Sequence, residues 1–573
     1  MRNSIKILIS AILIFALLIP ATTVSASFEL PEFLRVGLYF GSNARANMRI
    51  TSSEGLRLGF YEGTQFTPIW QTSGNVIIRK DTHFATSAAG VNGIAEVGTE
   101  AAQWGPFHVQ YFANVPIYQA QARIDELAAH GIHAYVAVIG LATHIWGGTH
   151  VSYDAASAAA VNSPIPGASV APVSDRRINV MCAERMETVF VFGHMTLGLG
   201  VRPASEDIEN QRFNVYTASQ LNYRGGLDFT RLDGGDMTVT NVVHLEHYLY
   251  HVVPREMPAS WPIEALKAQA VAARNFAVSA GDRHRETPFN LCNTVHCQVY
   301  LGTTPEIASA VQAVNETRGQ VLLFNGVPAR VFYSSSFGGP SDYSQNVWMQ
   351  AIPYLIPVSN HYENTENINN GVWTNTMTVQ QVTDRMNARG QGVGTVTNIE
   401  VLETTRAGNV LRVRVTGTQG YHDILREQAR IAFAPATLSQ RFAVARGGQG
   451  PSVLAVPNID GGTSGGTTAT QTIHAIDGSG IVSVINQQNV YVMTGSGLQT
   501  RNLSATAQPP QQSGGNIAYI TAYGTDPNVF YFAGRGWGNP VGMSQFGALG
   551  MANAGYTFDQ ILTHFFPGTY MSR

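Results

Sequence analysis

The sequence has 573 residues, which is enough for several domains of ordinary size. Its formal net charge of −3 excludes the strongly basic surface of a typical nucleic-acid-binding protein. Only 13 % of the residues are charged and 57 are glycine, a balance typical of neutral, β-rich extracytoplasmic proteins. We therefore expect a multidomain α+β protein that is rich in β structure and has no nucleic-acid partner.

The first 26 residues have the pattern of a secretory signal. A short basic start with Arg2 and Lys6 precedes an apolar run over residues 7–18, and a small-residue end follows at Ser25 and Ala26. This pattern predicts a signal peptide over residues 1–26 and an exported protein. The alternative is a retained membrane anchor, because the apolar run is close to the shortest length that spans a bilayer.

Two regions with different patterns follow the signal. Residues 27–103 contain "FLRVGLYFGS" and "NVIIRKDTHF", which alternate apolar and polar residues as short strands do. Residues 104–164 instead predict a strand, a helix ending near Gly131 and a returning strand, and "THVSYDAASAAAV" begins a second such pass. This duplicated unit resembles a SPOR domain, which implies binding to glycan of the bacterial cell wall. The alternative is a small α+β spacer without a ligand.

The remaining large domain is expected over residues 205–573. Within it, residues 446–471 are rich in Gly, Ser, Thr and Pro, and alternating residues follow them. This composition predicts a loop with a strand pair inserted into the domain at about residues 446–530.

A helix dense in alanine is expected after Pro262, which with Glu264 suits a helix N-terminus. Its small side chains allow close packing, so the helix should be buried and Arg274 inside it should need a partner. Glu256 precedes this helix at a turn, where functional side chains often lie. It is either a solvated loop residue or an acid held in a cleft.

The motifs of this region occur together and in a recognisable order. They are "LEHYLYHVVPREMP", "EALKAQAVAARNFA", "LCNTVHCQVYLG", "VFYSSSFGGPSDYSQNVW" and "GRGWGNPVGMSQFGALGMANAGYTFDQILTHFFPGT". In these motifs the chain resembles the stage II sporulation protein D family (SpoIID/LytB type), whose members are bacterial cell-wall lytic transglycosylases and amidase enhancers. The resemblance implies a cell-wall location and peptidoglycan glycan strands as the partner.

The resemblance places the family's catalytic acid at Glu256. A lytic transglycosylase cleaves the MurNAc–GlcNAc bond without water, and the 6-hydroxyl of the sugar forms a 1,6-anhydro end. One carboxyl group can therefore act first as acid and then as base, provided that an apolar pocket raises its pKa. Met257, Trp261 and Tyr248 are candidates for that pocket. The substrate is expected to be peptide-stripped glycan; the alternative is a non-catalytic protein that enhances an N-acetylmuramoyl-L-alanine amidase.

Further cleft residues are expected to bind the glycan. They are Arg274, Tyr333, Ser334, Ser335, Ser336, Ser544 and Gln545. The chain departs from the family at Asn539 and Pro540, where members usually have His and Gly. This departure supports the non-catalytic alternative.

The chain has three cysteines, and two of them lie close together with His296 between them. In some family members this segment binds zinc, and the four residues with suitable ligand atoms are His284, Cys292, His296 and Cys297. If His296 and Cys297 were adjacent on a strand, however, they would point to opposite faces. A zinc site, a local disulfide and free thiols all remain open, and no cofactor is required by the proposed reaction.

Overall fold

The computed structural model describes residues 28–572 apart from 89, 209–210, 217–219, 232–233, 282, 303–305 and most of 457–517. In that last segment it gives only the short strands β29 (Ala475–Ile476), β30 (Val482–Ser483), β31 (Asn489–Thr494) and β32 (Gly497–Asn502). The predicted signal peptide lies outside the described residues. No helix in the described part is long and apolar enough to span a membrane.

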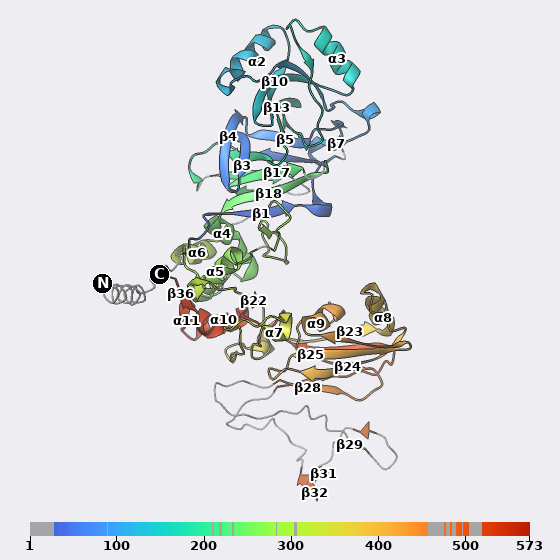
Figure 1. Ribbon diagram of the computed structural model, residues 1–573. Helices are drawn as coiled ribbons and strands as arrows, with labels where there is room; N and C mark the ends of the chain where they lie inside the picture. Colours follow the sequence, from blue (N-terminus) through green and yellow to red (C-terminus); the bar gives the residue numbers. More distant parts are fainter. Residues whose placement is uncertain are drawn as a thin grey trace, which may run out of the picture.

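Two large sheets form one end and the middle of the molecule (Figure 1). The first has seven strands in the order β19 (Leu291–Cys292), β1 (Phe33–Tyr39), β18 (Met237–His244), β17 (Gly226–Arg231), β14 (Leu199–Pro203), β3 (Leu56–Glu62) and β4 (Gln65–Thr72). The second has ten strands in the order β11 (Ser169–Val170), β8 (Phe107–Phe112), β10 (Ala142–His150), β9 (Ala134–Ile139), β13 (Glu187–Gly193), β12 (Ile178–Cys182), β5 (Asn75–Lys80), β2 (Asn47–Thr51), β15 (Arg212–Tyr216) and β16 (Gln220–Arg224).

This topology differs from the domain boundary predicted near residue 103. Strand β1 pairs with β18, β3 pairs with β14, and β2 pairs with β15, so the first strands complete sheets that residues 199–292 also build. The segment 27–103 therefore shares its core with the later region. The short hairpin of β6 (Phe84–Thr86) and β7 (Ile94–Glu96) lies within it.

The predicted repeat over residues 104–164 is present as two strand–helix passes. Helix α2 (Ala120–Ala129) joins β8 to β9, and α3 (Tyr153–Val161) joins β10 to β11. Their strands have the order β11-β8-β10-β9 in the sheet, and β9 pairs in parallel with β13. The unit is thus one end of the ten-stranded sheet. Its resemblance to a SPOR domain stays a prediction.

A helical layer lies below the seven-stranded sheet in Figure 1. It comprises α4 (Leu245–Glu256), α5 (Ile263–Val278), α6 (Ala308–Glu316), α10 (Gln545–Asn553) and α11 (Phe558–Phe565). Helix α5 contacts the other four, and its alanines from Ala265 to Ala273 are buried. Small side chains permit this close approach on several faces at once.

Short strand pairs join the two distant parts of the chain that build this layer. Strand β22 (Tyr333–Ser334) pairs with β35 (Met543–Ser544), and β20 (Leu322–Phe324) pairs with β21 (Val327–Pro328) and β36 (Tyr570–Met571). Motifs about 200 residues apart in sequence are therefore brought side by side.

A separate core forms the other end of the molecule. It is built from β23 (Val372–Thr378), α8 (Val379–Ala388), β24 (Val396–Thr404), β25 (Val410–Gly417), β26 (Gly420–Leu425), α9 (Glu427–Phe433), β27 (Phe442–Arg446) and β34 (Val529–Arg535). The short helix α7 (Gln345–Trp348) precedes it, and β28 (Ser452–Val456) pairs with β33 (Ala518–Ala522). That pair frames the predicted insertion, most of which lies outside the described residues.

Candidate active site

Glu256 is the last residue of helix α4, and a short turn separates it from α5. Pro254 lies in the last turn of α4, where its missing N–H removes one helical hydrogen bond. A helix C-terminus disfavours a nearby negative charge, so this position already opposes ionisation of the carboxyl group.

The Glu256 carboxyl group lines a cavity of about 230 Å³. The other lining residues are Phe276, Val295, His296, Cys297, Val299, Phe332, Tyr333 and Asn539. Burial raises the pKa of Glu256 above its ordinary value, although the Val299 N–H donates to Oε1 at 3.4 Å and opposes the shift. The position and the pKa both suit a proton donor.

None of the three residues predicted to form this pocket lines the cavity. Met257 is buried in the core, and the Trp261 ring packs on Phe546 at 4.9 Å. Burial raises the pKa of Tyr248 well above its ordinary value, and the nearby Glu256 adds a smaller contribution, although Tyr248 does not line the cavity.

Tyr333 is the predicted glycan-binding residue that the structure places beside Glu256. Burial, followed by the charge of Glu256, raises the pKa of its phenol well above the ordinary value. The Gln298 side-chain amide donates to the Tyr333 hydroxyl at 2.8 Å and accepts from the Tyr248 hydroxyl at 3.0 Å. Gln298 thus orients both phenols, a role that the motif "HCQVYLG" did not reveal.

The serines predicted to bind sugar divide into two groups. Ser334 donates to the Asn539 carbonyl at 2.7 Å, and the Ser335 carbonyl accepts from the Phe546 N–H. Ser336 and Ser544 are fully buried, and both hydroxyls donate to the carboxylate of Glu363, at 2.6 and 2.5 Å. Ser336 and Ser544 are therefore structural in this geometry, contrary to the prediction.

Glu363 was missed in the sequence and is a central acceptor of this region. Its carboxylate receives six hydrogen bonds, from the hydroxyls of Ser336, Ser544 and Thr365, the Asn360 amide and the N–H groups of Phe337 and Gly338. The carboxylate holds the "SSSFGG" turn against the C-terminal motif. Gln545 is also buried, and its amide donates to Gln269 at 3.3 Å.

Arg274 does not face the cavity. Its side chain is fully buried and makes a two-fold ion pair with Glu246, at 3.0 and 2.5 Å, and it donates to the Gln320 carbonyl. The partner that the sequence required is therefore Glu246. A guanidinium held in this way cannot also bind a glycan, so the substrate-binding prediction for Arg274 is wrong.

Trp537 is 46 % exposed, so it does not fill the core. Gly536 and Gly538 on either side of it have φ values of +83° and +107°, which explains glycine at both positions of this turn.

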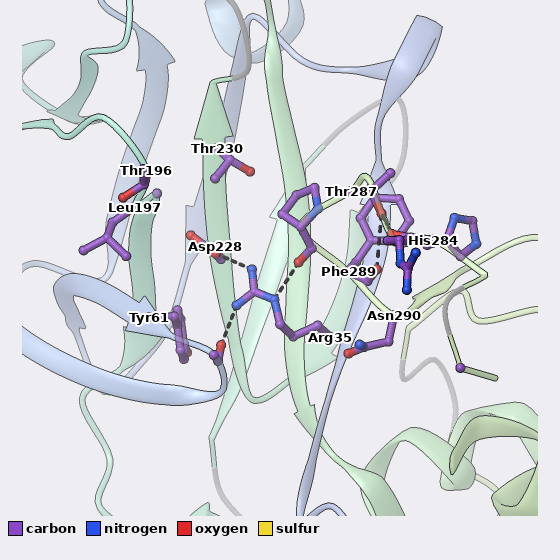
Figure 2. Close-up of a pocket in the computed structure, with 15 residues that line it drawn as sticks. Arg35, Tyr61, Thr196, Leu197, Asp228, Thr230, His284, Thr287, Phe289 and Asn290 are labelled. Atoms are coloured by element: carbon purple, nitrogen blue, oxygen red, sulfur yellow. Dashed lines mark hydrogen bonds and ion pairs between the residues drawn. The ribbon is translucent and has the colours of Figure 1, made fainter. Parts of the chain in front are cut away.

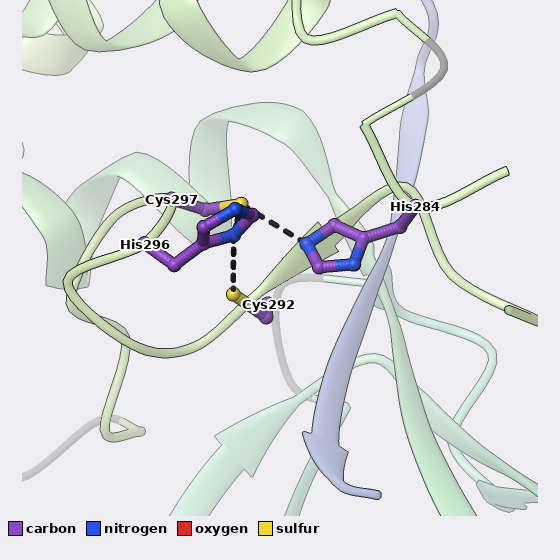
Figure 3. A group of neighbouring side chains, drawn as sticks. All are labelled: His284, Cys292, His296 and Cys297. Atoms are coloured by element: carbon purple, nitrogen blue, oxygen red, sulfur yellow. Dashed lines mark hydrogen bonds between the residues drawn. The ribbon is translucent and has the colours of Figure 1, made fainter. Parts of the chain in front are cut away.

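His284, Cys292, His296 and Cys297 converge as the sequence suggested, with their ligand atoms all within 4.8 Å of one another (Figure 3). His296 and Cys297 lie in a turn after β19, so the alternation of a strand does not separate them. The Cys297 sulfur is 3.3 Å from His284 Nε2 and 3.5 Å from His296 Nδ1. No disulfide joins Cys292 and Cys297, both of which are described.

The donor set of this cluster fits zinc. Two thiols and two imidazoles are the ligands of common structural zinc sites. Burial lowers the pKa of His284, which favours the neutral ring that binds a metal. The cluster borders the Glu256 cavity through His296 and Cys297. A second cavity, lined in part by the loop residues 284–290, includes His284 (Figure 2).

Comparison with known proteins agrees with these motifs. Residues 233–324, which contain α4, α5 and the cysteine segment, match the model of the stage II sporulation protein family SpoIID. This segment is therefore similar to the SpoIID family, which is the family that the motifs resemble.

Three relatives illustrate the extent of the similarity. The chain is 28 % identical over 331 residues to the amidase enhancer of Bacillus subtilis, covering 56 % of this chain and 40 % of that protein. It is 25 % identical over 345 residues to stage II sporulation protein D of the same organism, covering 58 % and 75 %. An uncharacterised protein of Brachyspira hyodysenteriae is 29 % identical over 260 residues, covering 45 % and 68 %.

Proposed function

We propose that the protein is an exported lytic transglycosylase that cleaves MurNAc–GlcNAc bonds of peptide-stripped peptidoglycan strands. The observation that carries the proposal is the partly buried Glu256, whose pKa is raised in a cavity shared with Tyr333. Among the lining residues of that cavity, all of them described, Glu256 is the only carboxylate. A hydrolase of the common type needs two, so the arrangement favours a reaction that uses one.

In the proposed reaction the Glu256 carboxyl group acts first as an acid and then as a base. Protonated Glu256 donates its proton to the glycosidic oxygen, and the bond from that oxygen to C1 of the MurNAc residue breaks. The carboxylate then accepts the proton of the 6-hydroxyl as that oxygen bonds to C1. The products are a new GlcNAc hydroxyl and a 1,6-anhydro-MurNAc end, and Glu256 is again protonated. Removing such an acid–base group should cost about 10²–10⁴ in rate.

The cysteine–histidine cluster would hold a zinc ion in this account. Bound zinc would supply structural cross-linking between the loop that carries His284 and the turn at residues 293–297. The same turn continues to Val299, whose N–H donates to Glu256. In this proposal the four side chains position the wall of the cavity, and only Glu256 donates and accepts the proton.

A non-catalytic role is the second candidate. One relative is an amidase enhancer, so a cell-wall amidase is the partner that this role would require. The match spans 40 % of that relative. Asn539 in the cavity, where the family usually has His, also favours this role. In either case we infer cell-wall association, with residues 104–164 as a glycan-binding unit.

Product analysis separates the two candidates. The purified protein is incubated with peptide-stripped glycan strands, and the products are examined by mass spectrometry. A lytic transglycosylase releases 1,6-anhydro-MurNAc ends. A non-catalytic enhancer releases none by itself but raises the rate at which an added N-acetylmuramoyl-L-alanine amidase removes stem peptides from intact peptidoglycan.

A further inference from the structure

A cavity of about 460 Å³ lies between the seven-stranded sheet and residues 284–290. It shares no lining residue with the Glu256 cavity. The two cavities border the same cysteine–histidine cluster, however, because His284 lines one while His296 and Cys297 line the other. Its size falls within the range of about 300–1,000 Å³ that is usual for small-molecule sites.

Arg35 organises this cavity (Figure 2). Its guanidinium donates to Asp228 Oδ2 at 2.5 Å, to the Pro288 carbonyl at 2.6 Å and to the Gly63 carbonyl at 2.7 Å. The side chain thus joins strand β17 to the loop that carries His284. Three acceptors fix the guanidinium, and the ion pair neutralises Asp228.

Two buried polar atoms that line the cavity have no hydrogen-bond partner among the residues that the structure describes. They are Asp228 Oδ1 and Thr230 Oγ1, on residues 3 % and 9 % exposed. Residues two apart on a strand point to the same face, so both side chains of β17 face the same way. Leaving such atoms unpaired costs free energy, and a ligand that hydrogen-bonds to both would recover it.

The charges of the lining favour a neutral ligand. Asp228 is already paired with Arg35, and Arg285 also lines the cavity, so an ammonium group would meet cationic side chains. The carboxylate oxygen needs a hydroxyl or amide N–H donor. Tyr61, Leu197 and Phe289 add apolar surface, which suits the C–H face of a sugar ring.

We propose that this cavity is a second saccharide-binding subsite, which holds one sugar residue through hydroxyl or acetamido donors to Asp228 and Thr230. The proposal extends the proposed function to a second place on the glycan, but it does not require Glu256 to be catalytic.

The test uses the purified protein and the trisaccharide of N-acetylglucosamine in isothermal titration calorimetry. Thr230→Val removes the hydroxyl at nearly constant shape, and Asp228→Asn replaces the charged acceptor. Thr67→Val, at an exposed position on β4 of the same sheet, is the matched control. We expect each cavity variant to weaken binding about tenfold, as for a lost hydrogen bond, and the control to leave it unchanged. Thermal unfolding measurements show whether each variant is folded. If Asp228→Asn does not fold, Thr230→Val alone tests the proposal.

An affinity that is the same in wild type and folded Thr230→Val overturns the proposal, as does failure of the wild type to bind the trisaccharide. Failure of the subsite proposal can be distinguished from failure of the transglycosylase proposal. If the wild type releases 1,6-anhydro ends while the cavity variants bind normally, only the subsite is wrong. If the variants lose binding and no anhydro ends appear, only the transglycosylase proposal is wrong.

Discussion

The Ser334 hydroxyl donates a hydrogen bond of 2.7 Å to the backbone carbonyl of Asn539. The bond joins the serine-rich turn to the C-terminal motif, next to the pairing of β22 with β35. Since it uses the main chain of residue 539, it does not depend on the side chain there. Asn539 also lines the Glu256 cavity, and its side-chain Oδ1 accepts from the Val541 N–H at 3.3 Å.

The effect of Asn539 and Pro540, which stand where family members usually have His and Gly, can be tested by substitution. Asn has a donor and an acceptor where a neutral His has one of each, so the replacement preserves hydrogen bonding. We expect Asn539→His with Pro540→Gly to raise turnover on stripped glycan modestly and to leave the unfolding midpoint almost unchanged. If the wild type were inert and the double variant active, the protein would be a degenerate binder.

Glu363 should be essential for stability. In Glu363→Gln an amide NH₂ group would replace one oxygen, and several of the six donors would then lose their acceptor. Hydrogen bonds to a charged group contribute about 1.5–3 kcal/mol each, so we expect a loss of at least about 3 kcal/mol in urea denaturation. The control is Glu366→Gln, whose exposed ion pair with Arg535 should contribute at most about 1 kcal/mol. Equal losses in the two variants would contradict the structural role of Glu363.

The sequence pointed to the SpoIID motifs, to Glu256 as a residue of a cavity and to the convergence of His284, Cys292, His296 and Cys297, because each lies in a local motif. It could not distinguish a serine that faces substrate from one that faces Glu363, since Glu363 lies 27 positions from Ser336 and 181 positions from Ser544. Arg274 was assigned to substrate for the same reason, although its burial on an alanine-rich helix already required a partner. The pairing of β1 with β18 joins residues about 200 positions apart, and no local pattern encodes it.

Zinc binding is predicted for the cluster. We expect about one equivalent of zinc per chain by elemental analysis, and a rise in the unfolding midpoint when zinc is added to chelator-treated protein. Cys292→Ser and Cys297→Ser should each lose both effects. Cys182→Ser, at a buried cysteine on β12, should keep them. Zinc retained by the first two variants would show that the metal binds elsewhere.

The raised pKa of Glu256 also predicts a pH-dependent stability difference. A carboxyl group whose folded pKa lies above the unfolded value of 4.5 contributes stability fully below that value. This contribution is lost as the pH rises through the folded pKa. Glu256→Gln cannot ionise, and its amide oxygen can still accept from Val299. We therefore expect the variant to match the wild type near pH 4 and to be more stable near pH 8. A variant that is less stable near pH 8 would contradict burial as the cause of the shift.

The most direct test of the central claim measures 1,6-anhydro-MurNAc ends released from peptide-stripped glycan by the wild type and by Glu256→Gln. Glu316→Gln, at an exposed position on α6, is the control. Loss of the single acid–base group should lower the rate about 10²–10⁴-fold without unfolding the protein, and the control should keep the parent rate. A folded Glu256→Gln protein that releases anhydro ends at the wild-type rate would contradict the assignment.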